Sequence, residues 1–161
     1  MSDADPAADR VRSHLSTRAK ARKRALDILF EADLRGTDPR ETLAIRSDLA
    51  DPPVREYTAE LVNGVIRHQG EIDRRISSCM GRSWTLDRMP RVDRAAARIA
   101  VYEIDQTEVP DGVAVAEAVA LVSDLSTDES PGYLNGLLGA VLATKPGASD
   151  TDTVDHPARS A

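Results

Sequence analysis

Apolar residues recur at spacings of three, four and seven along most of this 161-residue chain, which is the period of amphipathic α-helices. No segment shows the clear alternation of apolar and polar residues that a half-buried strand requires. The longest apolar stripe contains seven residues: Val54, Tyr57, Leu61, Val65, Ile72, Ile76 and Cys79. This stripe is too long for one ordinary helix, and Gly70 is the predicted break between two helices.

Capping signals mark the start of other helices. Asp38-Pro39 and Ser130-Pro131 are pairs of an N-cap residue and a first-turn proline. The predicted helices cover residues 16–34, 39–49, 54–79 with the break at Gly70, 89–104, 115–125 and 130–143. The pattern therefore predicts an all-α fold, a compact bundle of about seven helices.

The two ends of the chain lack this periodicity. Residues 1–15 are rich in Asp, Ala and Arg, and we expect them to form a mobile leader. Residues 145–161 are poor in large apolar side chains, and we expect a disordered tail. One helical domain, residues 16–144, is predicted between them.

Composition agrees with a helical protein of the cytoplasm. Aromatic residues make up 3% of the chain, fewer than a β-sandwich would need, and the single Cys79 excludes an internal disulfide. There is no apolar run of about 18 residues that could span a membrane. The first residues also lack the apolar segment of a signal peptide, so a cytoplasmic location with no membrane contact is expected.

Basic residues gather in one short segment. Residues 10–24 contain seven Lys or Arg and no Asp or Glu, although the chain carries a net charge of −6. The segment runs directly into the apolar-periodic stretch ALDILFEADL, which places the charges on a packed helix. A solvated basic face or a disordered arm is the alternative. The segregation of charge favours a polyanionic partner, with nucleic acid the leading candidate.

Motifs for catalysis or cofactor binding are absent from the sequence. It contains no HExxH, CxxC, GxGxxG or GxxxxGK[ST] pattern, and its three His residues are scattered. No metal site, cofactor or catalytic residue is predicted. A binding module is therefore favoured over an enzyme.

Four stretches of the chain, taken in order and spacing, carry a resemblance to a known family: RAKARKRALDILFEAD, WTLDRMPRVDRAAARIAVYEI, VAVAEAVALVSDLSTDESPG and YLNGLLGAVL. They resemble the NusB family of bacterial transcription antitermination factors, and the middle and last stretches are most similar to actinobacterial members. The resemblance extends from about Thr17 to Ala143.

The resemblance implies a fold and a set of partners. The expected fold is an all-α bundle of two small helical subdomains packed together. NusB proteins pair with NusE, a protein of the small ribosomal subunit, and bind single-stranded boxA RNA of nascent ribosomal RNA transcripts. The pair helps polymerase resist termination, so the transcription elongation complex is a further implied partner.

The resemblance also assigns RNA-binding residues. Arg18, Lys20 and Arg22 match the family's arginine-rich arm, and Phe30 and Tyr133 match aromatic residues beside the RNA. Aromatic and guanidinium groups are suitable neighbours for an unstacked base. The alternatives are that the arginines cover the end of the core stripe and that both aromatics are ordinary core residues.

Three acidic residues match partner-binding positions of the family. Asp87 and Asp93 correspond to residues that face NusE, and Glu129 to a position linked to RNA and NusE binding. Without the family, these residues would be a helix cap, a solvated acid and a helix-start acid. Further residues also match the family, and we expect them to serve packing and internal hydrogen bonding: Trp84, Arg94, Arg98 and Asn135-Gly136.

The sequence departs from the family at two places. Ala19 and Ala21 interrupt the basic arm, where other members often have adjacent arginines, and Pro131 and Gly132 replace polar or basic residues. A second class of function also stays open. The chain could be a purely protein-binding helical module, or a homodimer without direct RNA contact.

Overall fold

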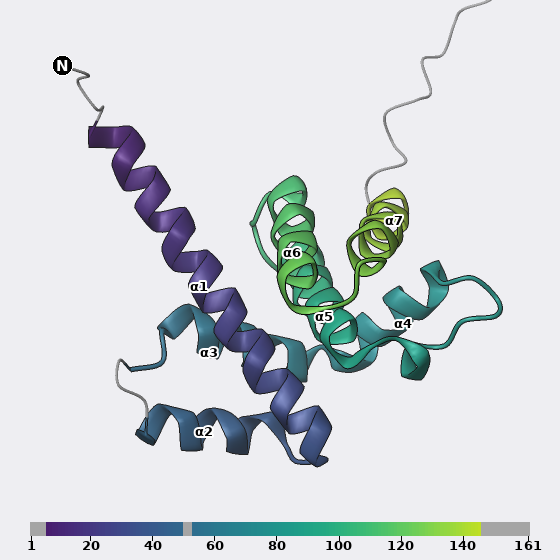
Figure 1. Cartoon of the computed structure of the whole chain (residues 1–161), viewed down its shortest axis with the longest axis horizontal. Helices are drawn as coiled ribbons and strands as arrows, with labels where there is room; N and C mark the ends of the chain where they lie inside the picture. The colour runs from purple at the N-terminus through teal and green to yellow at the C-terminus, as the bar shows by residue number, and fades with distance from the viewer. Residues whose placement is uncertain (1–5, 50–52, 146–161) are drawn as a thin grey trace, which may run out of the picture.

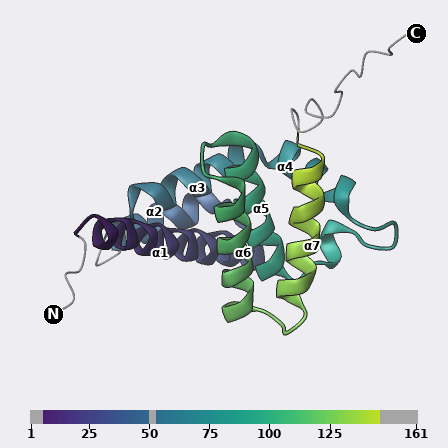
Figure 2. The same ribbon diagram turned by 90° about the horizontal axis from the view of Figure 1, so that it is seen from above.

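The computed structural model describes residues 6–49 and 53–145. In these residues, seven α-helices and one short 3-10 helix follow one another, with no strand (Figures 1 and 2). The helices are α1 Pro6–Arg35, α2 Pro39–Leu49, α3 Glu56–Arg67, α4 Gln69–Cys79, η1 Leu86–Arg88, α5 Arg91–Gln106, α6 Asp111–Leu125 and α7 Ser130–Ala143. The predicted all-α class is confirmed.

The first helix is longer than predicted. It begins at Pro6, ten residues before the expected start, so residues 6–15 of the expected leader are helical. Proline is tolerated in a first turn, and the following residues include Ala7, Ala8, Arg10 and Arg12, which favour helix. Residues 1–5 of the leader and residues 146–161 of the expected tail lie outside the described residues.

The break between the third and fourth helices also differs from the prediction. It lies at His68, which is the C-cap of α3 and the N-cap of α4, rather than at Gly70. The His68 backbone N–H still donates to the Gly64 carbonyl, 3.1 Å away, so the interruption is slight. Periodicity detected the change of helix, but not the residue at which the chain turns.

Helix α5 lies at the centre of the bundle, with eleven of its residues buried. It contacts α1 and α3 on one side and α4, α6 and α7 on the other. Figure 1 shows α1 lying across α2 and α3, while α6 and α7 lie beside α5. These groups correspond to the two expected subdomains, and one continuous apolar core joins them through α5. No helix in the described part of the chain is both long and apolar enough to cross a membrane.

Small residues let α3 and α5 approach each other closely. A Cβ atom added at Gly64 would lie 2.2 Å from Cζ of Tyr102, a contact that no relaxed structure has. The Tyr102 side chain is only 7% exposed, so it has little room to move away. The mid-helix glycine therefore serves this contact rather than helix formation.

We expect Gly64→Ala to lower the free energy of unfolding by about 1–3 kcal/mol, because it overpacks this contact. Gly139→Ala in α7 is the matched control, since a Cβ there meets nothing within 4 Å. That change should stabilise the protein by about 0.5–1 kcal/mol through helix propensity alone. Urea unfolding followed by circular dichroism measures both. Equal effects of the two substitutions would show that the α3–α5 contact tolerates a methyl group.

Candidate nucleic-acid interface

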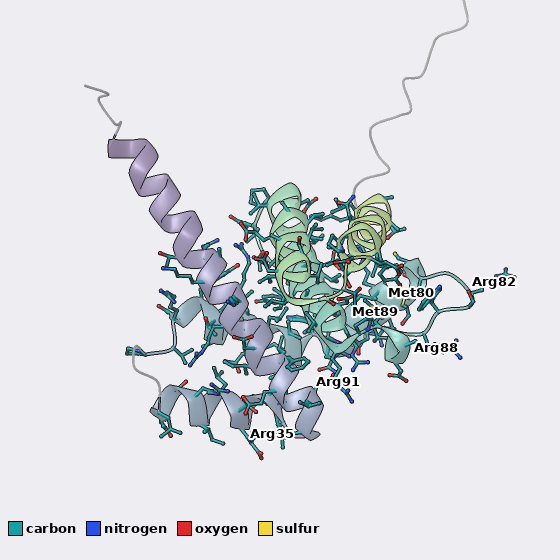
Figure 3. The ribbon with its side chains drawn as sticks, viewed as in Figure 1. Arg35, Met80, Arg82, Arg88, Met89 and Arg91 are labelled. Atoms are coloured by element: carbon teal, nitrogen blue, oxygen red, sulfur yellow. The ribbon has the colours of Figure 1, made fainter. Side chains whose placement is uncertain are left out.

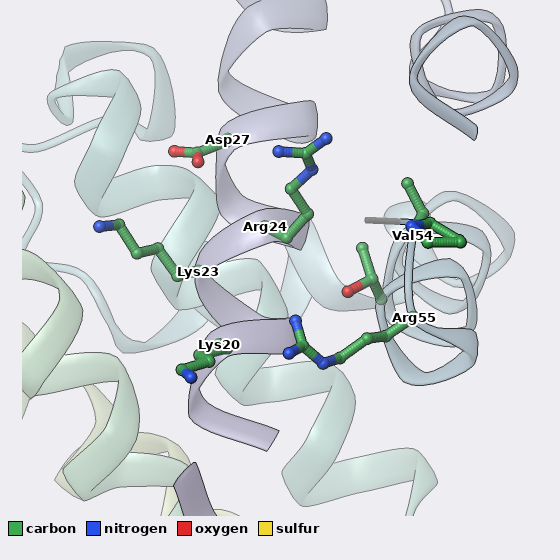
Figure 4. Close-up of a pocket in the computed structure, with 8 residues that line it drawn as sticks. Lys20, Lys23, Arg24, Asp27, Val54 and Arg55 are labelled. Atoms are coloured by element: carbon green, nitrogen blue, oxygen red, sulfur yellow. The ribbon is translucent and has the colours of Figure 1, made fainter. Parts of the chain in front are cut away.

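A basic groove lies between α1 and the start of α3. Its volume is about 420 Å³, and it is lined by Lys20, Lys23, Arg24, Asp27, Pro53, Val54, Arg55 and Thr58. In Figure 4, Arg55, the residue before α3, reaches toward α1, whereas the side chains of Lys20 and Lys23 point away from Val54 and Arg55. Four cations and one carboxylate therefore line the groove. We call this site the α1–α3 basic groove.

The single carboxylate of the groove, that of Asp27, is outnumbered by the four cations around it. Burial raises the pKa of Asp27, and this effect outweighs the lowering by Lys23, Arg24 and Arg46. Lys20 and Lys23 are exposed and Arg24 is partly exposed, so their charges are open to solvent. The groove is therefore suited to an anion such as a phosphate.

Arg18 lies one turn before the groove and is held by an aromatic ring. Its guanidinium carbon is 4.5 Å from the centroid of the Tyr57 ring, which is cation–π geometry. The Tyr57 hydroxyl donates a hydrogen bond to Glu103. Burial and this hydrogen bond raise the pKa of Tyr57, so the hydroxyl keeps its proton at neutral pH. Arg18 itself is exposed, as the prediction of an RNA contact requires.

Arg22 occupies a different place from the one predicted. It is 1% exposed, and its Nε and Nη2 atoms each donate to the Glu103 carboxylate at 2.9 Å. Burial lowers the pKa of Arg22, but the hydrogen bond and charge of Glu103 raise it more, so the group stays charged. A guanidinium held in this way cannot reach a phosphate, and the prediction of an RNA contact at Arg22 is corrected: this arginine is structural.

The alanines that interrupt the basic arm have a structural explanation. Ala21 is fully buried, and its carbonyl accepts a hydrogen bond from the Thr58 hydroxyl of α3, 3.0 Å away. A long basic side chain at this position would collide with α3. The interleaved pattern therefore divides α1 into a face that packs on α3 and α5 and a face that carries charge.

The two predicted aromatic contacts lie at the other end of α1 and on α7. Phe30 and Tyr133 are both partly exposed. One turn after Phe30, Asp33 accepts a hydrogen bond from Arg94 Nη2 at 2.6 Å and pairs with Arg91 at 3.4 Å. These bonds join the end of α1 to the first turn of α5. Tyr133 lies 6.0 Å from Trp84, measured between ring centroids.

Asp93 does not face a partner. It is 2% exposed, and its carboxylate accepts hydrogen bonds from the Ser126 and Ser130 hydroxyls, the latter at 2.8 Å. It thereby ties the first turn of α5 to the first turn of α7. The predicted NusE contact at Asp93 is corrected to a buried structural acceptor. Ser130, which was the predicted N-cap of the last helix, is instead the first residue of α7, and the N-cap is Glu129.

Two predicted partner residues remain at the surface. The Asp87 side chain is 100% exposed, with one oxygen 4.0 Å from Arg94 Nη1. Glu129 is exposed at the start of α7, where its side chain makes no capping hydrogen bond. Both stay predictions for partner binding. No group of three or more His, Cys, Asp or Glu residues that could hold a metal occurs among the described residues.

Sequence reasoning missed several residues of this surface. Arg55 follows a Pro-Pro pair and gave no signal, because its position in the groove depends on how α3 packs on α1. Trp84 was read as a packing residue but is 53% exposed, and Asn135 and Gly136 are exposed as well. The internal reading of Arg94 and Arg98 is confirmed, since they donate to Asp33 and Asp73.

We expect Arg22→Met to lower the free energy of unfolding by about 3–5 kcal/mol, because it leaves Glu103 buried and unpaired. Arg46→Met is the control, since Arg46 pairs with Glu31 at the surface, where loss of a pair costs less than about 1 kcal/mol. Chemical unfolding compares them. An Arg22 variant as stable as the parent would contradict the structural role of this arginine.

Comparison with known proteins agrees with this geometry. The model of the NusB family matches residues 19–143. The transcription antitermination protein NusB of Cutibacterium acnes is 49% identical over 144 residues, which are 89% of this chain. The chain spans 55% of the length of that relative. NusB of Acidothermus cellulolyticus is 55% identical over 132 residues, covering 81% of this chain and 90% of that protein.

A solved structure gives the same result. A chain in a crystal structure of the antitermination factors NusB and NusE in complex with double-stranded RNA superimposes with a TM-score of 0.66 and 29% identity. The match covers 77% of this chain and 94% of that one. Because the family model matches most of the sequence and curated relatives share about half of its aligned residues, the chain belongs to the NusB family.

Proposed function

We propose that this protein is a transcription antitermination factor that binds single-stranded boxA RNA of nascent ribosomal RNA transcripts together with NusE. The α1–α3 basic groove is the observation that carries the proposal, because it concentrates positive charge on a chain of net charge −6. Membership of the NusB family supports it. So does the likeness to a structure that contains NusB, NusE and RNA. Bacterial transcription takes place in the cytoplasm, which is the proposed location.

Phosphate contacts are proposed for the exposed cations of α1 and for the start of α3. Arg18 and Lys20 belong to the predicted arm, while Lys23, Arg24 and Arg55 are added by the groove. Phe30 and Tyr133 are proposed to stack on bases, since both rings are partly exposed. The net charge of −6 disfavours RNA on the acidic parts of the surface, so the cationic residues mark the favoured site.

NusE is proposed to bind near Asp87, with Glu129 at the border between NusE and RNA, since the family position that Glu129 matches is linked to both. A competing function is a protein-binding module or homodimer without RNA contact. The exposed side chains of Ile45 and Leu49, one turn apart on α2, favour some protein contact on that helix. Measuring boxA binding decides between the two functions.

Replacing both Arg18 and Lys20 by Ala should weaken boxA binding by the complex with NusE. It should also flatten the dependence of log affinity on log salt by about 1.4, since each phosphate contact to a single strand contributes roughly 0.7. Fluorescence anisotropy with boxA RNA over a salt series measures both quantities.

The charge-matched control for this experiment is the pair Arg40→Ala and Arg74→Ala, two exposed arginines of α2 and α4. It should leave the salt slope unchanged. If the Arg18 and Lys20 variant kept the parent's affinity and slope, the arm would not be the RNA site. If the parent itself did not bind boxA with NusE, the competing function would be favoured.

Asp87→Lys should reduce the association rate with NusE roughly several-fold at low salt, because a rim charge acts mainly on the encounter with a basic partner. Asp124→Lys on α6 makes the same charge change at another exposed position and should have little effect. Stopped-flow or surface-based kinetics give the rates. Equal rates for the two variants would place the NusE contact elsewhere.

A further inference from the structure

Trp84 is the single tryptophan of the chain, and its exposure needs an explanation. It is 53% exposed, which is unusual for the largest apolar side chain. The backbone N–H of Trp84 donates to the Gly81 carbonyl at 3.0 Å, so the residue is held in a turn. Its ring is 6.0 Å from that of Tyr133, with an angle of 45° between the planes. Two aromatic rings from distant parts of the chain therefore share one site.

A groove of about 370 Å³ opens beside these rings. Its lining includes Met89 and Pro90 before α5, and the carboxylates of Asp93 and Glu129. Met89 is 3% exposed and Asp93 is 2% exposed, so this floor is fixed by the core. The hydrogen bonds from Ser126 and Ser130 to Asp93 also hold the start of α7, which carries Tyr133. We call this site the Trp84 groove.

The chemistry of the Trp84 groove fits a flat, uncharged group with hydrogen-bond donors. The exposed carboxylate of Glu129 disfavours a phosphate beside it, while the aromatic faces favour stacking. Both oxygens of Asp93 already accept hydrogen bonds from Ser126 and Ser130. A carboxylate accepts readily from the exocyclic amine of a base, as Glu and Asp do from cytosine. Adenine and cytosine have such an amine, whereas uracil does not.

One cation, Arg88, belongs to the lining of the groove, and further cations lie outside it. Figure 3 shows Arg82, Arg88, Arg91 and Arg35 along one edge of the molecule, from the loop before η1 to the end of α1. Among the described residues, Arg82 and Arg88 form no ion pair, so their charges are available. This arrangement suits a strand whose base enters the groove while its phosphates stay at the rim.

The groove also continues the surface proposed for RNA. Helix α1 leads from the α1–α3 basic groove to Phe30 and then to Asp33, whose bonds to Arg91 and Arg94 join it to the first turn of α5. Asp93, which lies between Arg91 and Arg94 in the same turn, lines the Trp84 groove. The Trp84 groove therefore lies beside the end of the helix that carries the basic residues.

We propose that the Trp84 groove holds one unpaired base of the bound RNA, an adenine or a cytosine, stacked on Trp84 and Tyr133. The proposal rests on the RNA-binding function above and adds the site at which a base is read. Trp84 contributes sequence preference, and Arg88 contributes a phosphate contact. The salt dependence of binding therefore separates the two residues.

The test uses the full chain assembled with NusE and a single-stranded boxA oligonucleotide. Trp84→Ala should weaken binding roughly tenfold, the order expected for loss of one stacked base, with no change in salt slope. Trp84→Phe, which keeps an aromatic face, should recover most of the affinity. Arg88→Ala should instead flatten the slope by roughly 0.7. Because Trp84 is exposed, circular dichroism should show that all three variants are folded.

A series of oligonucleotides, each with one abasic position, identifies the base. One abasic position, an adenine or cytosine in the parent RNA, should cost the parent protein about the same tenfold as Trp84→Ala. The same abasic RNA should cost the Trp84→Ala variant nothing further, as expected when the two changes remove one contact. Replacing that base by uracil should lower affinity, and Trp84 fluorescence, taken as the difference from Trp84→Phe, should be quenched by the parent RNA.

The possible outcomes distinguish this proposal from the proposed function. If the parent binds boxA with a slope that depends on Arg18 and Lys20, but Trp84→Ala binds equally well, the groove proposal is overturned and the function stands. Independent effects of Trp84→Ala and every abasic position would also overturn it. If Trp84→Ala weakens NusE binding in the absence of RNA and leaves the abasic series unchanged, the groove holds protein instead. Absence of boxA binding by the parent overturns both proposals.

Discussion

The buried ion pair between Arg22 of α1 and Glu103 of α5 is the interaction on which the rest of the structure depends. It joins the first helix to the central helix, and the Tyr57 hydroxyl of α3 donates to the same carboxylate. Because residues on a helix are about 100° apart, turning Arg22 inward determines where every other side chain of α1 points. Lys20 and Lys23 consequently face solvent. One internal contact therefore sets the orientation of the whole basic surface.

This arrangement separates stability from binding within one short basic segment. Arg22 contributes to packing, whereas Arg18 lies on the outer side of Tyr57 and keeps its charge in solvent. The ring of Tyr57 contacts both arginines. Its centroid lies 4.5 Å from the guanidinium carbon of Arg18 and 5.7 Å from that of Arg22. A protein of net charge −6 can thus present a local cationic face, because four cations and a single carboxylate line the α1–α3 basic groove.

The first turn of α5 has a second organising role. Asp33 of α1 and Ser130 of α7 both bond to this turn, through Arg94 and Asp93. It therefore places the end of the basic helix beside the start of the last helix, although they are about a hundred residues apart in the sequence. The aromatic pair formed by Trp84 and Tyr133 lies at this junction. A short stretch of α5 thus sets the position of the end of α1 relative to the start of α7.

The sequence by itself determined the helical class, nearly every helix and the location of the basic segment, because these follow from local periodicity, capping residues and charge. Only the tertiary structure decided which side of each helix is buried. Arg18 and Arg22 are one turn apart and chemically alike, yet one faces solvent and the other is buried against Glu103. Asp93 and Asp87 differ in the same way. Local sequence does not indicate a hydrogen-bond partner that lies about eighty residues away. Whether a charged side chain is buried or exposed therefore depends on how distant helices pack.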